Sequence, residues 1–206
     1  MDFKIIRLVL GDYQTNCYIL FNENKEAIII DPGAEAHKVI NAVKENDLKV
    51  LSIIITHAHP DHFGALEKVR DEFKVKAYLS EDDSEMLAKR SGELNGMLGV
   101  KDEPLKADIL VKDGDTIPFG NKELKVISTP GHTPGGICLL IDKVLFSGDT
   151  LFYGSIGRTD FPGGDYDTII ASLHKLMKLD KDIVVLPGHG PETSIEFERA
   201  NNPFIR

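Results

Sequence analysis

The seven residues Thr56 to His62 constrain this chain more strongly than any other segment. They read THAHPDH, so that three imidazoles and one carboxylate fall within six residues. The six residues before them, VLSIII, are largely apolar on both faces, as in a central strand of a sheet. Polar groups at the end of a buried strand are costly unless they have partners. The segment therefore predicts a metal site, and imidazole and carboxylate ligands suit zinc, iron or manganese.

The positions of these four side chains indicate two ions rather than one. His57 and His59 are two residues apart on an extended loop, so they can face the same ion. Asp61 and His62 lie on the turn that opens the next helix and point elsewhere, where they can serve a second ion.

Three later segments each place one more candidate ligand directly after an expected strand. TPGHTPGG contains His132, FSGDT contains Asp149 and LPGHG contains His189. Each of these residues stands beside a glycine, whose small size lets the backbone approach an ion closely. A histidine or aspartate after a strand is by itself an ordinary turn residue. Four such segments in one chain favour a shared metal centre.

Hydrophobic periodicity alternates between strand and helix along the chain. Strands are expected at 3–9, 17–21, 27–30, 50–55, 75–79, 122–128, 137–141, 144–147 and 183–186. Helices are expected at 35–46, 66–73 and 167–178. A further helix at 84–98 is expected to be broken by Gly92 and Gly96, and so to be loose or lid-like. The pattern predicts a single α/β domain over residues 1–206, with sheets inside and helices outside.

Charge and composition disfavour several classes of function. The chain has 206 residues with 24 basic and 33 acidic side chains, a net charge of −9, which disfavours general nucleic-acid binding because that contact needs a basic face. Its apolar runs are far shorter than the ~18 residues that span a bilayer, and its amino terminus lacks the features of a signal peptide. The two cysteines, Cys17 and Cys138, are expected to be buried free thiols. A cytoplasmic protein with no membrane or nucleic-acid partner is therefore expected.

The combined motifs resemble the pattern of the metallo-β-lactamase superfamily, which is HxHxDH, a distant histidine, a bridging aspartate and a final histidine. The match runs from about Leu8 to Pro191. The resemblance implies a four-layer αβ/βα sandwich with the site on one edge, between the two halves. It also implies seven metal ligands: His57, His59, Asp61, His62, His132, Asp149 and His189.

This resemblance distributes the ligands over two divalent metal ions, zinc first, with iron or manganese as alternatives. One ion would have three histidines: His57, His59 and His132. The other would have a carboxylate and two histidines: Asp61, His62 and His189. Asp149 would bridge the two ions. Asp31, in a strand-Asp-Pro-Gly segment, would orient one of the ligands or else be an ordinary turn aspartate.

The sequence around the bridging aspartate resembles glyoxalase II, the hydroxyacylglutathione hydrolases, and particularly the short bacterial forms with GSIGRTD before PGGD. Longer members bind the glycine carboxylate of glutathione with a basic residue nine positions after the bridging aspartate, where this chain has Arg158. Tyr153 would line the same pocket or simply pack. Longer members also carry a helical C-terminal domain for glutathione, whereas only 17 residues follow His189, so no such domain is expected.

The implied reaction is hydrolysis of a small-molecule thioester such as S-D-lactoylglutathione. Two cations would lower the pKa of a bridging water toward ~7, and the resulting hydroxide would attack the carbonyl. A metal would stabilise the oxyanion. Asp61 and Asp149 are the expected catalytic carboxylates, with Asp61 placed to orient the hydroxide or take its proton.

Other functions stay open from the sequence. Persulfide dioxygenases share the GRTDF text and use a single iron, on residues that would correspond to His57, His132 and Asp149. Hydrolysis of a lactone or another ester would use the same fold. Antibiotic hydrolysis is disfavoured, because the zinc β-lactamases with the best-known broad activity carry cysteine at the position of Asp149. A non-catalytic module is expected to lack ligands, and none of the seven is missing.

Overall fold

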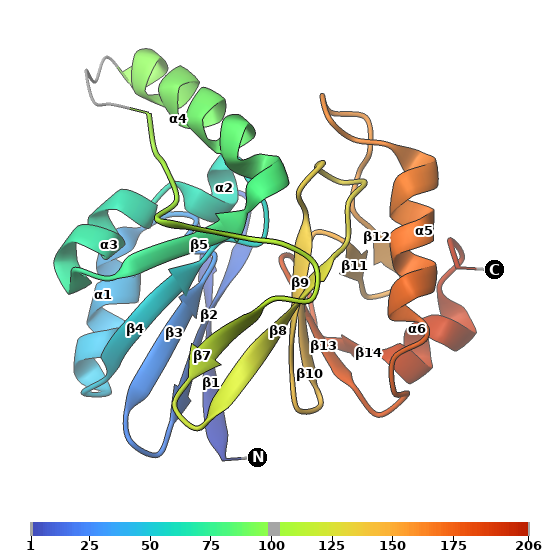
Figure 1. Cartoon of the computed structure of the whole chain (residues 1–206), viewed down its shortest axis with the longest axis horizontal. Coiled ribbons are helices and arrows are strands. Elements are labelled where there is room, and N and C mark those ends of the chain that lie inside the picture. The colour runs from blue at the N-terminus through green and yellow to red at the C-terminus, as the bar shows by residue number, and fades with distance from the viewer. Residues whose placement is uncertain (1, 99–103, 206) are drawn as a thin grey trace.

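The computed structural model describes residues 2–98 and 104–205 of the chain. Two six-stranded sheets face each other in the middle of the molecule (Figure 1). Helices α1 (Ala36–Glu45) and α3 (Leu66–Phe73) cover the outer face of one sheet, and α5 (Tyr166–Leu176) and α6 (Ile195–Asn201) cover the outer face of the other. This arrangement confirms the four-layer αβ/βα sandwich expected from the sequence.

The first sheet has the strand order β1-β2-β3-β4-β5-β6. Its strands are β1 (Phe3–Leu10), β2 (Thr15–Asn22), β3 (Glu26–Ile30), β4 (Lys49–Ile54), β5 (Lys76–Ser80) and β6 (Ile109–Val111). The pairs β1–β2 and β2–β3 are antiparallel, whereas β3 to β6 run parallel. Between these strands lie α1, the short α2 (Pro60–Phe63), α3, the 3-10 turn η1 (Glu81–Asp83) and α4 (Ser84–Leu98).

The second sheet has the order β14-β13-β10-β9-β8-β7. Its strands are β7 (Thr116–Phe119), β8 (Lys122–Ser128), β9 (Ile137–Ile141), β10 (Val144–Gly148), β13 (Val184–Pro187) and β14 (Thr193–Ser194). Only the β10–β13 pair in this sheet is parallel, among the strands that the structure describes. A small hairpin, β11 (Leu151–Phe152) and β12 (Ser155–Ile156), follows β10.

Three clusters of buried apolar side chains lie between the four layers. The first packs α1 and α3 against the first sheet, through residues such as Val39, Leu66 and Ile53. The second lies between the sheets and consists of strand residues such as Ile28, Ile54 and Phe146. The third joins α5 and α6 to the second sheet. The central strands contribute to the cores on both of their faces, which explains their continuous apolar sequences.

Strand ends bring the polar segments of the sequence to one edge of the sandwich. Thr56 follows β4, and its carbonyl accepts a hydrogen bond from the backbone N–H of Ile137 at the start of β9 (3.0 Å). On the other side, the backbone N–H of Asn16 in β2 donates to the carbonyl of Gly188 after β13 (2.7 Å). The two sheets are therefore joined directly at the edge where the candidate ligands lie.

The structure corrects one expectation about the helices. The segment 84–98 forms one continuous helix, α4, so the prediction that Gly92 and Gly96 break it is wrong. A glycine costs roughly 1 kcal/mol in a helix relative to alanine, but it keeps its backbone N–H and does not interrupt the hydrogen-bond ladder. Both cysteines are free and buried, as expected. None of the helices in the described residues is both long and apolar enough to span a membrane.

Candidate metal centre

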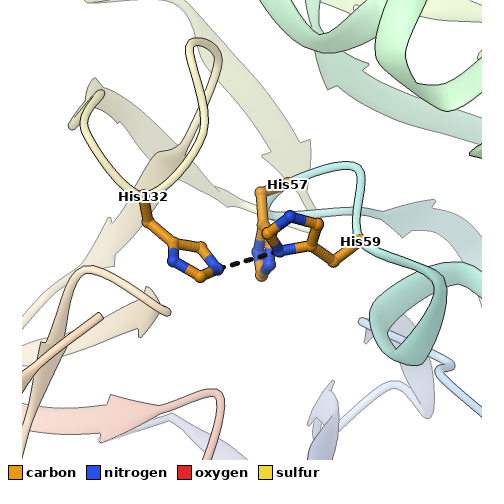
Figure 2. Close-up of side chains that lie close together, drawn as sticks. All are labelled: His57, His59 and His132. Atoms are coloured by element: carbon orange, nitrogen blue, oxygen red, sulfur yellow. Dashed lines mark hydrogen bonds between the residues drawn. The ribbon is translucent and has the colours of Figure 1, made fainter. Parts of the chain in front are cut away.

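His57, His59 and His132 form a compact three-histidine cluster. Figure 2 shows the three rings converging from two loops, one after β4 and one after β8. One ligand atom from each residue lies within 4.8 Å of the others. The closest pair is His59 Nδ1 and His132 Nε2 at 2.9 Å. All three side chains are buried, with 2%, 7% and 5% of their surface exposed.

Asp61, His62 and His189 form a second group of the same size, which we call the carboxylate cluster. Asp61 and His62 lie on α2, as expected from the turn at Pro60, and His189 follows β13. His189 Nε2 lies 3.2 Å from Asp61 Oδ2 and 3.3 Å from His62 Nε2. The two groups are not fully separate, because His57, His62 and Asp149 form a third group of ligand atoms within 4.8 Å of one another. The division of the HAHPDH segment between two ions stays a prediction.

Asp149 lies between the two clusters. Its Oδ2 is 3.5 Å from His132 Nε2 and 3.4 Å from His189 Nε2, and its Oδ1 is 3.4 Å from His62 Nε2. Gly188 is the close neighbour that makes room for it, because a Cβ atom there would lie 2.2 Å from Asp149 Oδ1. A single carboxylate is thus within reach of ligands from both clusters.

The donor atoms fit a cation better than they fit one another. Among the described residues, four buried side-chain polar atoms lack a hydrogen-bond partner, and three of them are His57 Nε2, His59 Nε2 and Asp149 Oδ1. Buried polar atoms are rarely left unpaired in proteins unless an ion or water satisfies them. Imidazole nitrogen and carboxylate oxygen are also the ligands that zinc and iron accept. The cluster therefore has the chemistry of a metal centre.

Two rings of the three-histidine cluster, His57 and His59, carry no charge that would repel a cation. Burial lowers the pKa of His57 well below its usual range, and the neighbouring His62 and His132 lower it further. Burial and His132 likewise lower the pKa of His59, to about 4. Both rings are neutral at pH 7 and can bind a metal without first losing a proton.

The carboxylate cluster has the opposite electrostatics. Burial alone would lower the pKa of His62, but Asp149 and Asp31 outweigh it and raise that pKa to about 9. Burial would also lower the pKa of His189, but its hydrogen bonds to Asp149 and Asp61 raise it to about 10. Although burial opposes ionisation of Asp61 and Asp149, the two imidazoles hold the pKa of each carboxyl below its usual range. Without metal, this cluster is a set of ion pairs.

Asp31 contacts a candidate ligand directly, and its role in orienting that ligand stays a prediction. Its Oδ2 accepts a hydrogen bond from His62 Nδ1 (2.9 Å), so the Nε2 of that ring faces the centre. The same carboxylate accepts hydrogen bonds from the backbone N–H and the hydroxyl of Thr56, both at 2.7 Å. One buried carboxylate after β3 thus fixes the start of the loop after β4 and one ring on α2.

A cavity of about 730 Å³ opens beside the candidate metal centre. Candidate ligands of both clusters line it: His59, Asp61, His132, Asp149 and His189. The rest of its wall includes Tyr13, Phe152, Ile156, Phe161 and Arg158. The guanidinium of Arg158 forms two hydrogen bonds of 2.7 Å with the carboxylate of Asp160 and lies 3.7 Å above the ring centroid of Phe161. The side chain of Arg158 therefore reaches the cavity already paired with an acid.

Tyr153 does not share this wall. Its ring is 52% exposed and stacks on Phe197 of α6, with 4.7 Å between the centroids. The packing role considered for Tyr153 thus has a partner in the structure, and its substrate-binding role stays a prediction.

Two residues at the start of β2 hold the centre although nothing in the sequence pointed to them. Thr15 Oγ1 donates to Asp61 Oδ2 (3.1 Å). Asn16 Nδ2 donates to the carbonyls of Pro187 and Gly190, both at 2.9 Å, on either side of His189. Their partners lie between 46 and 174 residues away along the chain. The sequence has no local signal for such contacts.

Comparison with known proteins agrees with this geometry. A family model described as the metallo-β-lactamase superfamily matches residues 10–189. The chain is 39% identical over 203 residues to the probable metallo-hydrolase YqgX of Bacillus subtilis, covering 97% of this chain and 96% of that protein. It is 37% identical over 210 residues to the hydroxyacylglutathione hydrolase GloC of Haemophilus influenzae, covering 100% and 98%.

Solved structures show the same architecture. The crystal structure of the BLEG-1 B3 metallo-β-lactamase superposes with a TM-score of 0.89 at 40% identity, covering 98% of this chain and 99% of that chain. The crystal structure of TTHA1623 in a di-iron-bound form gives a TM-score of 0.85 at 33% identity, covering 97% and 99%.

Proposed function

The chain belongs to the metallo-β-lactamase superfamily, and we propose that it is a metal-dependent hydrolase of small-molecule thioesters. The substrate we infer is S-D-lactoylglutathione or a related hydroxyacyl thioester, as in glyoxalase II. The proposal is carried by one observation, the convergence of seven potential ligands directly beside a cavity, with buried atoms of His57, His59 and Asp149 left without a hydrogen-bond partner.

We assign the seven side chains to two divalent cations. The three-histidine cluster would hold one ion, the carboxylate cluster would hold the other, and Asp149 would contact both. Zinc is our first choice, and the di-iron form of TTHA1623 makes iron the second. Cations bound there would polarise a carbonyl oxygen and make water a stronger nucleophile at neutral pH.

The residues around the centre support a role in orientation rather than in strong base catalysis. Asp61 and His189 are the two most exposed of the candidate ligands, with 23% and 27% of their side-chain surface accessible. Both line the cavity. Because the pKa of Asp61 is held below its usual range, its carboxylate stays ionised and is a weak proton acceptor. Thr15 fixes one of its oxygens. We infer that Asp61 orients the attacking water and the substrate carbonyl.

The thioester assignment is supported by the sequence after Asp149 and by one relative. The GSIGRTD segment lies on the cavity wall through Arg158, and the GloC relative is named a hydroxyacylglutathione hydrolase. A thiol is a good leaving group, so the reaction needs no strong general acid near the centre. Arg158 would exchange Asp160 for a carboxylate of the thiol part of the substrate.

The experiment that tests the proposal compares three reactions on one preparation of the full chain. Hydrolysis of S-D-lactoylglutathione is expected, at a rate that falls on metal removal and returns with zinc or iron. Oxygen uptake with glutathione persulfide in place of hydrolysis would identify a dioxygenase. A β-lactam is included because BLEG-1 is named a β-lactamase, and preferential β-lactam turnover would overturn the thioester assignment.

A further inference from the structure

Asp83 is a buried carboxylate outside the seven-ligand set. It ends the 3-10 turn η1, between β5 and α4, and its side chain has 0% exposed surface. Burying a carboxylate is unfavourable unless hydrogen bonds compensate for the lost hydration. The groups that compensate for it belong to the loops that carry the three-histidine cluster.

Three donors from two loops converge on this carboxylate. The backbone N–H of Ala58, the residue between His57 and His59, donates to Asp83 Oδ2 (2.8 Å). The hydroxyl of Thr133, the residue after His132, donates to the same oxygen (2.9 Å). The backbone N–H of Gly135 donates to Asp83 Oδ1 (2.7 Å). One side chain therefore spans the loop after β4 and the loop after β8.

The loops are packed closely around Asp83. A Cβ atom on Gly135 would lie 2.4 Å from the backbone nitrogen of Asp83 and 2.8 Å from its Cβ, so only glycine permits this approach. Ala58 is itself fully buried. Little displacement of either loop is possible while the three hydrogen bonds are made.

We propose that Asp83 is a positioning residue that fixes the distance between the His57–His59 loop and the His132 loop, and so sets the affinity of the three-histidine cluster for its metal. The assignment follows from Asp83 holding the backbone beside all three rings without contacting a ring atom as a hydrogen-bond partner. It rests on the proposed metal centre and does not depend on the substrate.

Asp83→Asn is the variant that tests this role. The asparagine keeps the size of the side chain but replaces one acceptor oxygen with an NH₂ group. Whichever way the amide is oriented, its NH₂ group faces either the N–H of Ala58 or that of Gly135, so one of the two backbone hydrogen bonds is replaced by an unfavourable donor–donor contact. Thr133→Val is the milder variant, because it removes the hydroxyl hydrogen bond and leaves both backbone N–H bonds to the Asp83 carboxylate in place.

Glu198 provides a matched control in the other half of the molecule. It is equally buried, with 0% exposed surface. Its carboxylate accepts hydrogen bonds from the backbone N–H of Gly154 (3.0 Å), the hydroxyl of Thr193 (2.6 Å) and Asn202 Nδ2 (2.7 Å). It therefore anchors the β11–β12 hairpin rather than a loop of the three-histidine cluster, and Glu198→Gln makes the same chemical change at a comparable cost in stability.

The experiment measures zinc affinity by competition with a chelator, in the full chain carrying His189→Ala. That background removes one ligand of the carboxylate cluster, so the zinc measured is the one at the three histidines. Asp83→Asn is expected to weaken zinc binding by about 10- to 100-fold, the usual size for a residue that orients metal ligands. Thr133→Val is expected to give a smaller loss in the same direction, and Glu198→Gln none. The absorption bands of bound Co²⁺ are expected to shift only in the first two variants.

Unchanged zinc affinity in both Asp83→Asn and Thr133→Val would overturn the proposal. Equal losses in Asp83→Asn and Glu198→Gln would also overturn it, because they would show a general effect of destabilisation. If Asp83→Asn does not fold, Thr133→Val decides by the same criterion. Since the measurement is metal affinity and not turnover, a failure of the thioester assignment leaves the result unaffected.

Discussion

The two halves of the metal centre are built from similar side chains but differ in charge and in access to solvent. In the three-histidine cluster none of the rings is more than 7% exposed, although His59 and His132 line the cavity. In the carboxylate cluster, Asp61 and His189 line the same cavity and are about a quarter exposed. The second half is therefore the more accessible of the two to a substrate in the cavity.

The two clusters differ in charge, and this difference affects how readily each binds a metal ion. Protons compete with a metal for the carboxylate cluster, because His62 and His189 are both protonated at neutral pH when no cation is present. No such competition exists at His57 and His59, whose rings are already neutral. Metal binding by His57 and His59 is thus nearly insensitive to pH around neutrality, whereas metal binding by His62 and His189 is strongly sensitive.

The largest effect is expected where the two halves meet, at Asp149. Asp149→Asn keeps the size of the side chain and removes the charge that offsets repulsion between two cations. We expect loss of the metal at the carboxylate cluster and a fall in kcat of at least ~10²-fold, with the circular dichroism spectrum unchanged. Metal content by mass spectrometry and thioester turnover measure these effects. Two bound metals with near-normal turnover would contradict a shared bridging ligand.

Measuring metal affinity as a function of pH tests whether the two clusters differ in protonation. Since the pKa of His62 is about 9 and that of His189 about 10 in the metal-free state, each ring must lose a proton before it binds a cation. Affinity at the carboxylate cluster should therefore rise with pH from 7 toward 9, by up to about tenfold per pH unit for each proton displaced. No comparable rise is expected from His57 and His59, because both rings are already neutral at pH 7.

Proton release during zinc titration distinguishes the two events. At pH 7 in a weakly buffered solution with an indicator dye, the zinc bound by the carboxylate cluster is expected to release more protons than the zinc bound by the three histidines. The His189→Ala variant serves as the control, because it removes one of the two protonated rings. If both zinc-binding steps release the same number of protons, the two clusters do not differ in protonation.

The candidate ligands of both halves could be identified in the sequence because each lies in a segment that follows a recognisable strand, and the strands before His57 and Asp149 have continuous apolar stretches. Buried parallel strands such as β4 have this pattern, and the glycines next to His132 and His189 mark where the chain turns. Asp83 could not be predicted in this way. Its donors are 25 and more residues away, and two of them are backbone groups that every sequence contains.

Secondary structure could likewise be predicted from the sequence only in part. Long central strands and amphipathic helices were predicted close to their observed bounds, whereas the short elements were missed: β6, β7, β11, β12, β14 and α6. These have two to seven residues, too few for a clear period. Most of the missed hairpin, β11–β12, lies on the cavity wall, so substrate contacts are the part of the site that sequence reasoning describes least well.

A smaller effect is expected at Arg158, on the wall of the cavity beside the metal centre. If Arg158 pairs with a carboxylate of a glutathione thioester, Arg158→Ala should raise KM about tenfold while kcat stays the same. This is the lower end of the range for a charged hydrogen bond, because the substrate must first replace Asp160. Asp160→Asn frees the guanidinium and should lower KM. Equal changes for a glutathione thioester and a small uncharged thioester would show that Arg158 is structural.

The smallest effect is expected at Tyr153, which lies at the turn of the β11–β12 hairpin and packs against α6. Its ring stacks on Phe197, and a stacked aromatic pair contributes about 0.5–1.5 kcal/mol beyond the area it buries. Tyr153→Ala should therefore lower the free energy of unfolding by about 1 kcal/mol, measured by urea denaturation, and leave KM for the thioester unchanged. Phe197→Ala should cost a similar amount, and the double variant less than the sum of the two, because the same contact is removed by each. A raised KM in Tyr153→Ala with unchanged stability would instead show that this ring contacts the substrate. The substrate-binding site would then extend as far as α6.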